Sequence, residues 1–593
     1  MISIRISWIG LCACILVLPT ASWAQGWTQW GQNSKHTGYS GTAGQSADQI
    51  LASIAIDPWA ASKIDDNGGE LLTHYPSPVI DGNDVFLMLE GGTYTACNSG
   101  ATPCGAGAWN TLTWSVRRFS WSGAGDSLDP QWTFTTDWVP EPGISWEPVF
   151  HPVVMGSYVY APGAAGSIWQ INRVDGTAAA QIFPSQTIDP NTYVSGPLTT
   201  DERGNIYYNA VELDPTNPWT ADVTNSWLVK VGTDGTVTTA SYSSLTPGAP
   251  AGTDQCYGTF SYSQLPWPPS PTAVPPAFPC GSQRPGINIT PAVAPDGTIY
   301  TISRAHLNSR YAYLVAVNPD LSPKWTASFR GLLNDGCGVT IPYSNDGGCR
   351  AGATAGVDYA TNDLPAAQVI DQSSSTPVVA PDGSILYGAY TDYNNSRGHL
   401  MHFDRTGVFL NAYDFGWDTT PAIFVHDGAY SVIEKDNYYP NGPYYITQLN
   451  SDLQIEWQFQ NTNTQSCIRN PDGTIGCLPA DADSNGFEWC INAPAVDVNG
   501  TVYVNSEDGK LYVLGQGGVL LQQLFLNWAL GSAYTPLALG PDGTIYTQNA
   551  GIVFVVGESL TGAISSFSED TDARTLRRRA AARAKRWTRL RDR

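Results

Sequence analysis

The sequence predicts an all-β protein, an eight-bladed β-propeller of four-stranded antiparallel blades with long insertions on one face. Three observations lead to this prediction. A phrase of proline, aliphatic residues, a tight turn and then β-branched or aromatic residues occurs eight times. A second phrase, which ends in tryptophan, follows several of these copies. The chain also contains 59 Gly and 42 Pro, with 11% aromatic residues, as expected for many strands joined by turns.

The first phrase predicts the inner hairpin of each blade. Its clearest copies begin at Pro291, with a turn at Asp296-Gly297, and at Pro536. Asp-Gly and Asn-Gly pairs supply the positive φ that a two-residue hairpin turn requires. The other copies begin at Pro78, Pro152, Pro197, Pro377, Pro421 and Pro494. Hairpins that recur in this way indicate a radial repeat, in which each unit packs mainly against its neighbours.

The second phrase predicts the two outer strands of a blade. Segments 313–317 and 445–449 alternate apolar and polar residues, and a turn and then Trp325 or Trp457 follow them. Such alternation is typical of half-buried strands. Related segments lie at 227–231, 399–403 and 510–514. Four-stranded units arranged as a closed ring leave few strand edges exposed, which favours a propeller.

These phrases resemble the repeat of the pyrroloquinoline-quinone-like propeller family, which runs Pro-Val-Val-x-Asp-Gly-x-Val-Tyr before an aliphatic strand, a turn and a Trp. Segment 377–383, Pro-Val-Val-Ala-Pro-Asp-Gly, matches it well, and the resemblance covers residues 26–557. The opening segment 27–31 is similar to the family's N-terminal strand. The resemblance therefore implies that residues 27–30 close the ring by pairing with residues 552–556. The family includes dehydrogenases and assembly scaffolds, so it leaves the function open.

The two ends differ from the body, which we expect to span residues 25–557. Residues 1–24 combine Arg5, an apolar stretch and a Ser22-Trp23-Ala24 cleavage site, which predicts a signal peptide and a secreted or periplasmic protein. Residues 558–593 form a basic tail, expected to be disordered. The sequence leaves open whether this tail contacts the acidic body, contacts an anionic envelope surface or is simply solvated. The net charge of −23 argues against nucleic acid as a partner of the body.

The cysteines of the body lie in local groups, as expected for disulfides within the loops of an exported chain. The expected pairs are Cys97–Cys104, Cys256–Cys280 and Cys337–Cys349. The last group is Cys467, Cys477 and Cys490, and its pairing stays open, with Cys467 and Cys477 counted among the bonded residues. No Cys-x-x-Cys motif occurs, which argues against zinc ribbons, thioredoxin-type redox chemistry and covalent haem.

Long insertions fall between the second and third strands of a blade and between consecutive blades, and both kinds of connection emerge on one face. This insertion-bearing face is the expected binding surface. Its candidate binding residues are His74, Tyr75, Asp137, Trp138, Trp146, Glu147, His151, Asp392, Tyr393, Arg397, Glu434 and Tyr438. Loop Asp residues often form turns instead, and surface aromatic residues often cover apolar side chains, so no catalytic residue is assigned.

The sequence leaves two cofactors open, calcium alone and the quinone together with calcium. Asp481, Asp483 and Asn485 match the opening of a calcium loop, but Asn492 stands where the closing Glu belongs, so a plain polar turn beside Cys490 competes with calcium. The family resemblance implies the quinone together with calcium as the second possibility. The chain has no adjacent cysteines and no motif that carries the quinone's ligands, so no cofactor is assigned.

One-sided insertions without a complete catalytic motif favour an exported, non-catalytic scaffold. It is expected to be a monomer and to bind a protein or glycan partner through the insertion-bearing face. Two enzyme classes are the alternatives. A polysaccharide lyase or hydrolase would use paired carboxylates, or a His with a Tyr, to move protons. A quinone-dependent dehydrogenase would need the cofactor discussed above.

Overall fold

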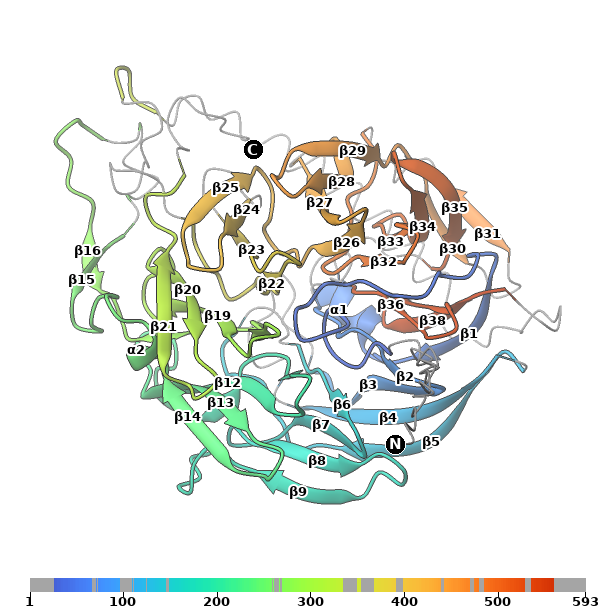
Figure 1. Ribbon diagram of the computed structural model, residues 1–593, viewed down its shortest axis with the longest axis horizontal. Helices are drawn as coiled ribbons and strands as arrows, with labels where there is room; N and C mark the ends of the chain where they lie inside the picture. Colours follow the sequence, from blue (N-terminus) through green and yellow to red (C-terminus); the bar gives the residue numbers. More distant parts are fainter. Residues whose placement is uncertain are drawn as a thin grey trace, which may run out of the picture.

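The computed structural model describes residues 26–66, 71, 73–95, 109, 111–123, 125–144, 149–258, 260, 266, 269–333, 349–353, 367–390, 398–438, 442–469, 474–478, 485–527 and 535–558 of the chain. Eight antiparallel sheets follow one another around a ring in chain order (Figure 1). The prediction of an all-β, eight-bladed propeller is confirmed. The expected signal peptide and all but the first residue of the expected tail lie outside the described residues.

The strands of each blade run from the centre of the ring outwards. Blade 1 is β2 (Val79–Asp81), β3 (Asp84–Gly92), β4 (Leu112–Ser122) and β5 (Ser127–Thr135), and blade 2 is β6 (Val153–Met155), β7 (Tyr158–Pro162), β8 (Ile168–Asn172) and β9 (Ala178–Ile182). Blade 3 is β10 (Thr192–Val194) and β11 (Thr199–Thr200), then β12 (Ile206–Glu212), β13 (Asn225–Val231) and β14 (Val237–Ser241). Blade 4 is β17 (Gln283–Pro285) and β18 (Ala292–Val293), then β19 (Ile299–Ala305), β20 (Ala312–Val317) and β21 (Pro323–Ser328). In blades 3 and 4 the innermost strand is split into two pieces, which pair with opposite ends of the second strand.

The second half of the ring repeats this plan. Blade 5 is β22 (Val378–Val379), β23 (Ile385–Tyr390), β24 (Gly398–Phe403) and β25 (Phe409–Tyr413), and blade 6 is β26 (Ala422–His426), β27 (Ala429–Asn437), β28 (Tyr444–Asn450) and β29 (Ile455–Gln460). Blade 7 is β32 (Ala495–Val496), β33 (Val502–Asn505), β34 (Lys510–Gly515) and β35 (Val519–Phe525). Blade 8 is β36 (Ala538–Leu539), β37 (Ile545–Asn549), β38 (Ile552–Gly557) and β1 (Gln49–Ala55).

Ring closure differs from the prediction made from the family resemblance. Residues 27–30 do not pair with β38; β1 does, with Ile50 opposite Val556 and Ala55 opposite Ile552. The first strand of the chain is therefore the outermost strand of the last blade, and Figure 1 shows β1 beside β38. The physical reason is that the earlier residues are engaged elsewhere: Trp27 makes its bridge to Ile80 of blade 1.

An inner segment, residues 26–45, runs along the inside of the ring and meets the blades in chain order. Backbone N–H groups of six inner strands donate to its carbonyl groups over 2.6–3.0 Å. The donors are Ile80, Val154, Val293, Val379, Ile423 and Val496, and the acceptors, in the same order, are the carbonyl groups of residues 27, 28, 34, 35, 37 and 38. In blade 3 the side chain of Gln29 substitutes, accepting from Thr200 N–H over 2.8 Å. In blade 8 the N–H of Gln45 donates to Gly543 O over 2.8 Å.

This inner segment satisfies groups that the blades themselves leave unpaired. Each donor lies beside a hairpin turn, on an innermost strand whose free edge faces the centre of the ring, and buried N–H groups need an acceptor. His36 crosses the centre, with its Nδ1 2.8 Å from Pro377 O and its Nε2 3.3 Å from Thr199 Oγ1. Trp27 and Trp30 are buried. The tight turns between the first and second strands of the blades lie on one face of the ring, which we call the hairpin-turn face. The inner segment therefore fills the centre of the ring on this face.

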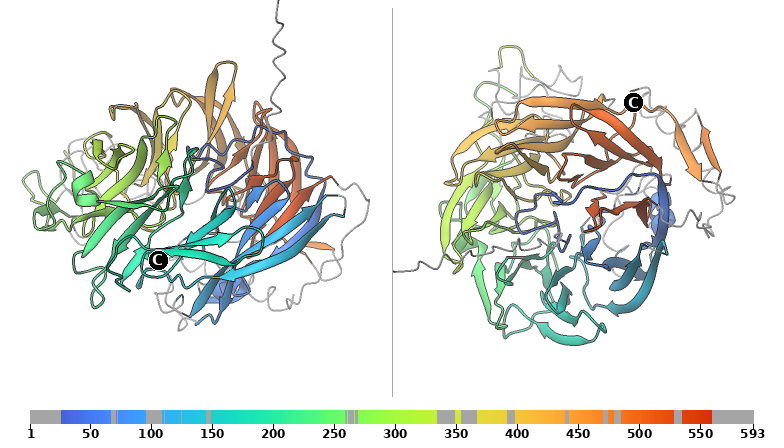
Figure 2. Two further views of the ribbon diagram at one scale, coloured as in Figure 1. Left: turned by 60° about the horizontal axis from the view of Figure 1, so that its bottom comes forward. Right: turned by 45° about the vertical axis from the view of Figure 1, so that its right-hand side comes forward.

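The opposite, insertion-bearing face carries the two short helices and the long connections. The helices are α1 (Ala60–Asp66) and α2 (Tyr242–Leu245). Two further hairpins, β15 (Gln255–Tyr257) with β16 (Ala277–Pro279) and β30 (Ser466–Arg469) with β31 (Ile475–Leu478), project from the rim (Figures 1 and 2). Among the described residues, no helix has the length and apolar character needed to cross a membrane.

Disulfides join the strands of both projecting hairpins, between Cys256 and Cys280 and between Cys467 and Cys477. The first pair was expected from the grouping of the cysteines, the second settles a pairing that the sequence left open, and both suit an oxidising compartment. Cys349 is disulfide-bonded as well. Cys97, Cys104 and Cys337 lie outside the described residues. Cys490 stays outside these disulfides as a buried thiol.

Candidate ligand-binding pocket

Most of the candidate residues named from the sequence do not come together at one site. The calls that fall outside the described residues are Trp146, Glu147, Asp392, Tyr393, Arg397, Asp481 and Asp483. Asn485 is exposed. Within the described ranges, no group of three or more His, Cys, Asp or Glu residues is placed to hold a metal ion.

Tyr75 takes part in a buried ion-pair network under α1. Lys63 of α1 contacts Asp57 over 2.9 Å and also contacts Glu90, and all three side chains are fully buried. The Tyr75 hydroxyl donates to the same Asp57 carboxylate over 2.6 Å. The ammonium group of Lys63 also lies 5.7 Å from the centre of the Trp109 ring. This network fixes the connection between blades 8 and 1, so the role of Tyr75 here is structural.

His74 lies in a second buried cluster, at the centre of the ring on the insertion-bearing face. Its Nε2 is 3.7 Å from the Asp418 carboxylate. The other oxygen of Asp418 accepts hydrogen bonds from Ser374 N–H and Oγ over 2.7 and 2.8 Å. Asn492 in turn donates to Ser374 Oγ. These side chains come from the connections that enter blades 1, 5, 6 and 7, and each is at most 2% exposed.

This central cluster bears on the quinone that the family resemblance implies. A planar quinone needs an open slot, and at this point the four buried side chains of the cluster contact one another instead. The described residues also offer no set of carboxylates for an accompanying calcium ion. The described residues at the centre of the ring therefore do not fit the cofactor, and no reaction step is assigned to it.

The remaining candidates serve packing or blade contacts. Asp137 is exposed and accepts from Trp169 Nε1 over 2.7 Å, and Trp138 packs edge-on against Trp114 at 4.8 Å between ring centres. His151 is buried against Trp30, at 5.7 Å, and burial lowers its pKa to about 3. Tyr438 is half-buried against Tyr445, at 6.2 Å. Glu434, expected among the binding residues of the insertion-bearing face, lies inside β27 and is fully buried, because that strand continues to Asn437.

A cavity of about 350 Å³ opens between blades 3 and 4 on the insertion-bearing face. Four separate parts of the chain line it: the connections before blade 2 and before blade 5, the connection from β12 to β13, and the inner edge of blade 4 with the connection after β19. The lining residues are Gly143, Ile144, Trp219, Arg284, Arg304, His306, Leu307, Asp371 and Gln372. Its volume is within the range of small-molecule sites, roughly 300–1,000 Å³.

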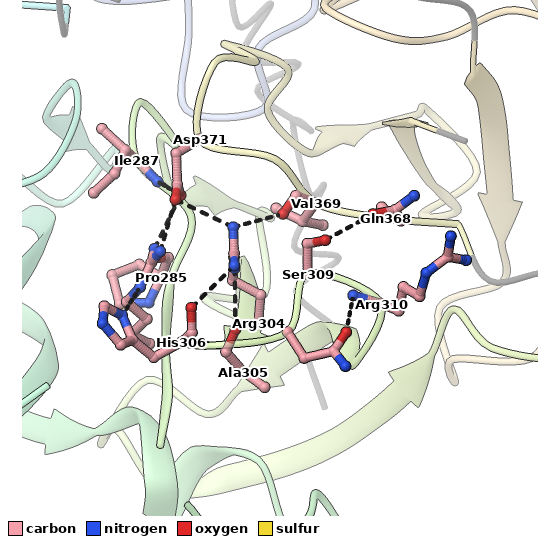
Figure 3. Close-up of polar contacts among 12 residues, drawn as sticks. Pro285, Ile287, Arg304, Ala305, His306, Ser309, Arg310, Gln368, Val369 and Asp371 are labelled. Carbon is pink, nitrogen blue, oxygen red and sulfur yellow. Dashed lines mark hydrogen bonds and ion pairs between the residues drawn. The ribbon is translucent and has the colours of Figure 1, made fainter. Parts of the chain in front are cut away.

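Two arginines share one aspartate in this pocket. Arg284 binds both oxygens of Asp371, through Nη1 over 2.9 Å and Nη2 over 2.7 Å. Arg304 Nη1 donates to the same carboxylate over 3.1 Å, and Ile287 N–H donates to it over 3.2 Å (Figure 3). Bidentate arginine–carboxylate pairs fix geometry as well as charge. Burial alone would raise the pKa of the Asp371 carboxyl, but the two guanidinium charges hold it well below its usual range.

His306 completes the network in its neutral form. Arg284 Nε donates to His306 Nδ1 over 2.8 Å, and an arginine has no acceptor, so the imidazole proton is placed on Nε2. Burial, together with the charges of Arg284 and Arg304, lowers the pKa of His306 to about 3. The imidazole is stacked on Trp219 at 5.8 Å between ring centres, and the Arg284 guanidinium lies 5.5 Å from the same indole.

Glu141 lies just behind the pocket wall formed by Gly143 and Ile144. Its side chain is 1% exposed, and neither carboxyl oxygen has a hydrogen-bond partner in the part of the chain that the structure describes. Burial is the main reason that its pKa is raised to about 8. The carboxyl group is therefore protonated at neutral pH. It adds no charge to the pocket there.

The residues of this pocket carry a net positive charge within an acidic protein. Arg284 and Arg304 are opposed by Asp371 alone, since His306 and Glu141 are neutral. Burial lowers the pKa of Arg304 to about 10, so this guanidinium stays protonated at neutral pH. Sequence reasoning named none of the four network residues as a binding residue. The usable signal was Arg304 at the end of an apolar strand, because a charge in such a strand requires a buried partner.

Comparisons with known proteins give structural neighbours only. No family model and no curated protein matches the sequence. A europium-containing methanol dehydrogenase is 11% identical, with 88% of this chain and 89% of that chain covered and a TM-score of 0.46. The quinohemoprotein alcohol dehydrogenase from Comamonas testosteroni is 11% identical, with 93% and 84% covered and a TM-score of 0.49. BamB from Moraxella catarrhalis is 13% identical, with 86% and 99% covered and a TM-score of 0.38.

At 11–13% identity and TM-scores below 0.5, no residue role and no activity is carried over from these neighbours. The function has to be argued from this chain's own side chains.

Proposed function

We propose that this protein is an exported, non-catalytic binding protein whose insertion-bearing face captures its partner through the pocket between blades 3 and 4. The observation that carries the proposal is the preformed polar cavity of about 350 Å³ on that face. Its charged side chains are already fixed by hydrogen bonds to one another and to the backbone. A site held in this way loses little conformational entropy when a ligand binds.

The state of the ionisable groups supports binding over turnover. Nδ1 of His306 is occupied by Arg284, so it is not free to accept a proton from a substrate. Asp371 is bound by two guanidinium groups and stays ionised. A general base needs a free lone pair within reach of the proton that it removes. Neither group offers one.

A polysaccharide lyase or hydrolase remains the rival function, and Glu141 is the observation that favours it. A carboxyl group that is protonated at neutral pH is suited to act as a general acid. Its burial behind the wall places it away from a ligand in the pocket, which is why we rank binding first.

The test uses the full mature chain, purified with its disulfides intact. A panel of neutral and acidic glycans is assayed for binding by titration calorimetry and, in parallel, for new reducing ends and unsaturated products. Binding without product is expected. Turnover of any glycan, or a quinone absorbance band with alcohol oxidation after addition of quinone and calcium, would overturn the non-catalytic function.

A further inference from the structure

We propose that the pocket between blades 3 and 4 binds the carboxylate of an acidic sugar, a uronate, which bridges Arg284 and Arg304. This inference rests on the proposed function, since it names the ligand of the same pocket. It goes further by fixing the chemical group that is recognised and the two residues that recognise it.

The charge of the pocket is the first reason. Its lining contains two arginines and one aspartate, so one positive charge remains once Asp371 is accounted for. His306 is neutral and cannot compensate it. The chain as a whole has a formal net charge of −23, so the pocket is positively charged within an acidic protein. A single negative charge on the ligand would balance it.

The unused hydrogen-bond donors are the second reason. A guanidinium group has five N–H bonds. Arg284 uses four of them, on His306 Nδ1, Pro285 O and the two oxygens of Asp371. Arg304 also uses four, on Ala305 O, Val369 O, His306 O and Asp371 Oδ2. Figure 3 shows the contacts of Arg304.

One N–H on Nη2 of each arginine is therefore left without a partner among the described residues. The two groups belong to guanidinium ions that share Asp371, and both ions line the cavity. A carboxylate has two oxygens that accept such bonds, and charge-assisted hydrogen bonds of this kind are about twice as strong as neutral ones. One ligand carboxylate would satisfy both donors and the charge.

The surroundings favour a sugar over a peptide as the source of that carboxylate. Peptides are recognised mainly through exposed strand edges, apolar grooves or aromatic-lined polyproline grooves. Here seven of the nine lining residues come from connections between strands, and only Arg284 in β17 and Arg304 in β19 lie in a sheet. The lining adds the indole of Trp219, which contacts His306 and Arg284 and whose apolar surface suits the apolar face of a pyranose.

The test compares two sugars that differ at C6 alone, where one carries a carboxylate and the other a hydroxymethyl group, and adds inorganic phosphate as a second anion. D-galacturonate, D-galactose and inorganic phosphate are titrated into the full mature chain. Galacturonate is expected to bind at least about tenfold more tightly than galactose, since a difference of tenfold corresponds to about 1.4 kcal/mol. A peptide with a free C-terminal carboxylate and its amidated form make up the second arm.

Leu307 provides a variant that leaves the arginine network intact. It lines the cavity and is half-buried. Leu307→Asp places a second negative charge in the pocket and should weaken galacturonate binding by at least about tenfold. Leu307→Asn makes nearly the same change in size and polarity as Leu307→Asp without the charge, so it should bind galacturonate at least about tenfold more tightly than Leu307→Asp. Arg304→Lys keeps the charge but loses the forked geometry, and it should reduce the preference for galacturonate over galactose. Thermal midpoints report whether each variant is folded.

Each outcome supports or overturns the inference. Selective binding of galacturonate, lost in Leu307→Asp and kept in Leu307→Asn, supports it. Equal affinity for galactose and galacturonate, absence of galacturonate binding, or preferred binding of phosphate or of the free-carboxylate peptide overturns it. Equal sugar binding without product would leave the proposed function standing. Product formation would overturn the proposed function even if galacturonate is selected.

Discussion

On the hairpin-turn face the eight blades meet one continuous piece of chain, whereas on the insertion-bearing face they meet connections from many parts of the sequence. The inner segment 26–45 makes backbone hydrogen bonds that repeat from blade to blade. The insertion-bearing face is held by side-chain networks that occur once each, around Lys63, Asp418 and Asp371. Repeated backbone contacts depend little on side-chain identity, but a unique network depends on every member.

Removal of residues 26–45 gives the largest expected effect. It deletes acceptors for seven inner-strand N–H groups and two buried indoles, Trp27 and Trp30. At about 0.5–1.5 kcal/mol per hydrogen bond and about 3–5 kcal/mol per buried indole, the loss in free energy of unfolding exceeds about 5 kcal/mol, which is comparable with the stability of a whole domain. Chemical denaturation followed by tryptophan fluorescence measures it. A truncated chain with an unchanged midpoint would show that the inner segment is dispensable.

Ion pairs on the two faces provide the next comparison. Lys63→Met leaves the buried carboxylates of Asp57 and Glu90 without their cation, which should cost about 3–5 kcal/mol in free energy of unfolding. Arg173 on the hairpin-turn face also binds two carboxylates, but all three groups are partly exposed. Arg173→Met should therefore cost about 1 kcal/mol or less. Equal losses in urea denaturation would contradict the distinction.

Glu141 predicts a pH dependence for the insertion-bearing face. The folded pKa of about 8 lies above the ordinary value of 4.5, because the buried carboxyl group is favoured in its neutral form. Its contribution to stability is complete below pH 4.5 and is lost as the pH rises through 8. Glu141→Gln should abolish this loss. At pH 9 it should raise the thermal midpoint and increase the free energy of unfolding by more than about 1 kcal/mol. A wild-type midpoint that stays flat from pH 5 to 9 would refute the shift.

His36 predicts the opposite sign for the hairpin-turn face. Burial lowers its folded pKa to about 4, below the ordinary value of 6.5. The stability that the neutral imidazole contributes is present above pH 6.5 and is lost as the pH falls toward 4. His36→Gln keeps a hydrogen-bonding side chain without the titration, so its midpoint should fall less between pH 7 and 4. If the thermal midpoints of the two proteins fall equally between pH 7 and 4, the acid sensitivity belongs to other groups.

Truncation after Phe567 gives the smallest expected effect. The basic tail has no strand pattern, and the last blade ends with β38, so the thermal midpoint should not change. Retention on anionic vesicles should fall and should weaken with salt, because exposed charges are screened over about 8 Å at physiological ionic strength. Equal retention of both chains would remove the anchoring role. A large drop in midpoint would mean that the tail packs on the ring.

Much of the fold follows from local signals. The hairpin phrases, their Asp-Gly turns and the period-two strands specify neighbouring residues, so sequence reasoning placed the blades and the insertion-bearing face. Ring closure was assigned to the wrong segment, because the choice between residues 27–30 and 49–55 depends on contacts with strands 500 residues away. The pocket was missed for the same reason. Arg284 and Asp371 are 87 residues apart, and no spacing rule joins them.

The inner segment also matches the number of blades. Its contacts advance around the ring in step with the sequence, from residue 27 at blade 1 to residue 45 at blade 8. A ring with one blade more or fewer would leave part of this segment without a matching strand or a strand without its acceptor. The length of this segment, residues 26–45, therefore matches a ring of eight blades. Gln45 and β1, near the start of the chain, can take their final places only when the last blade has been made.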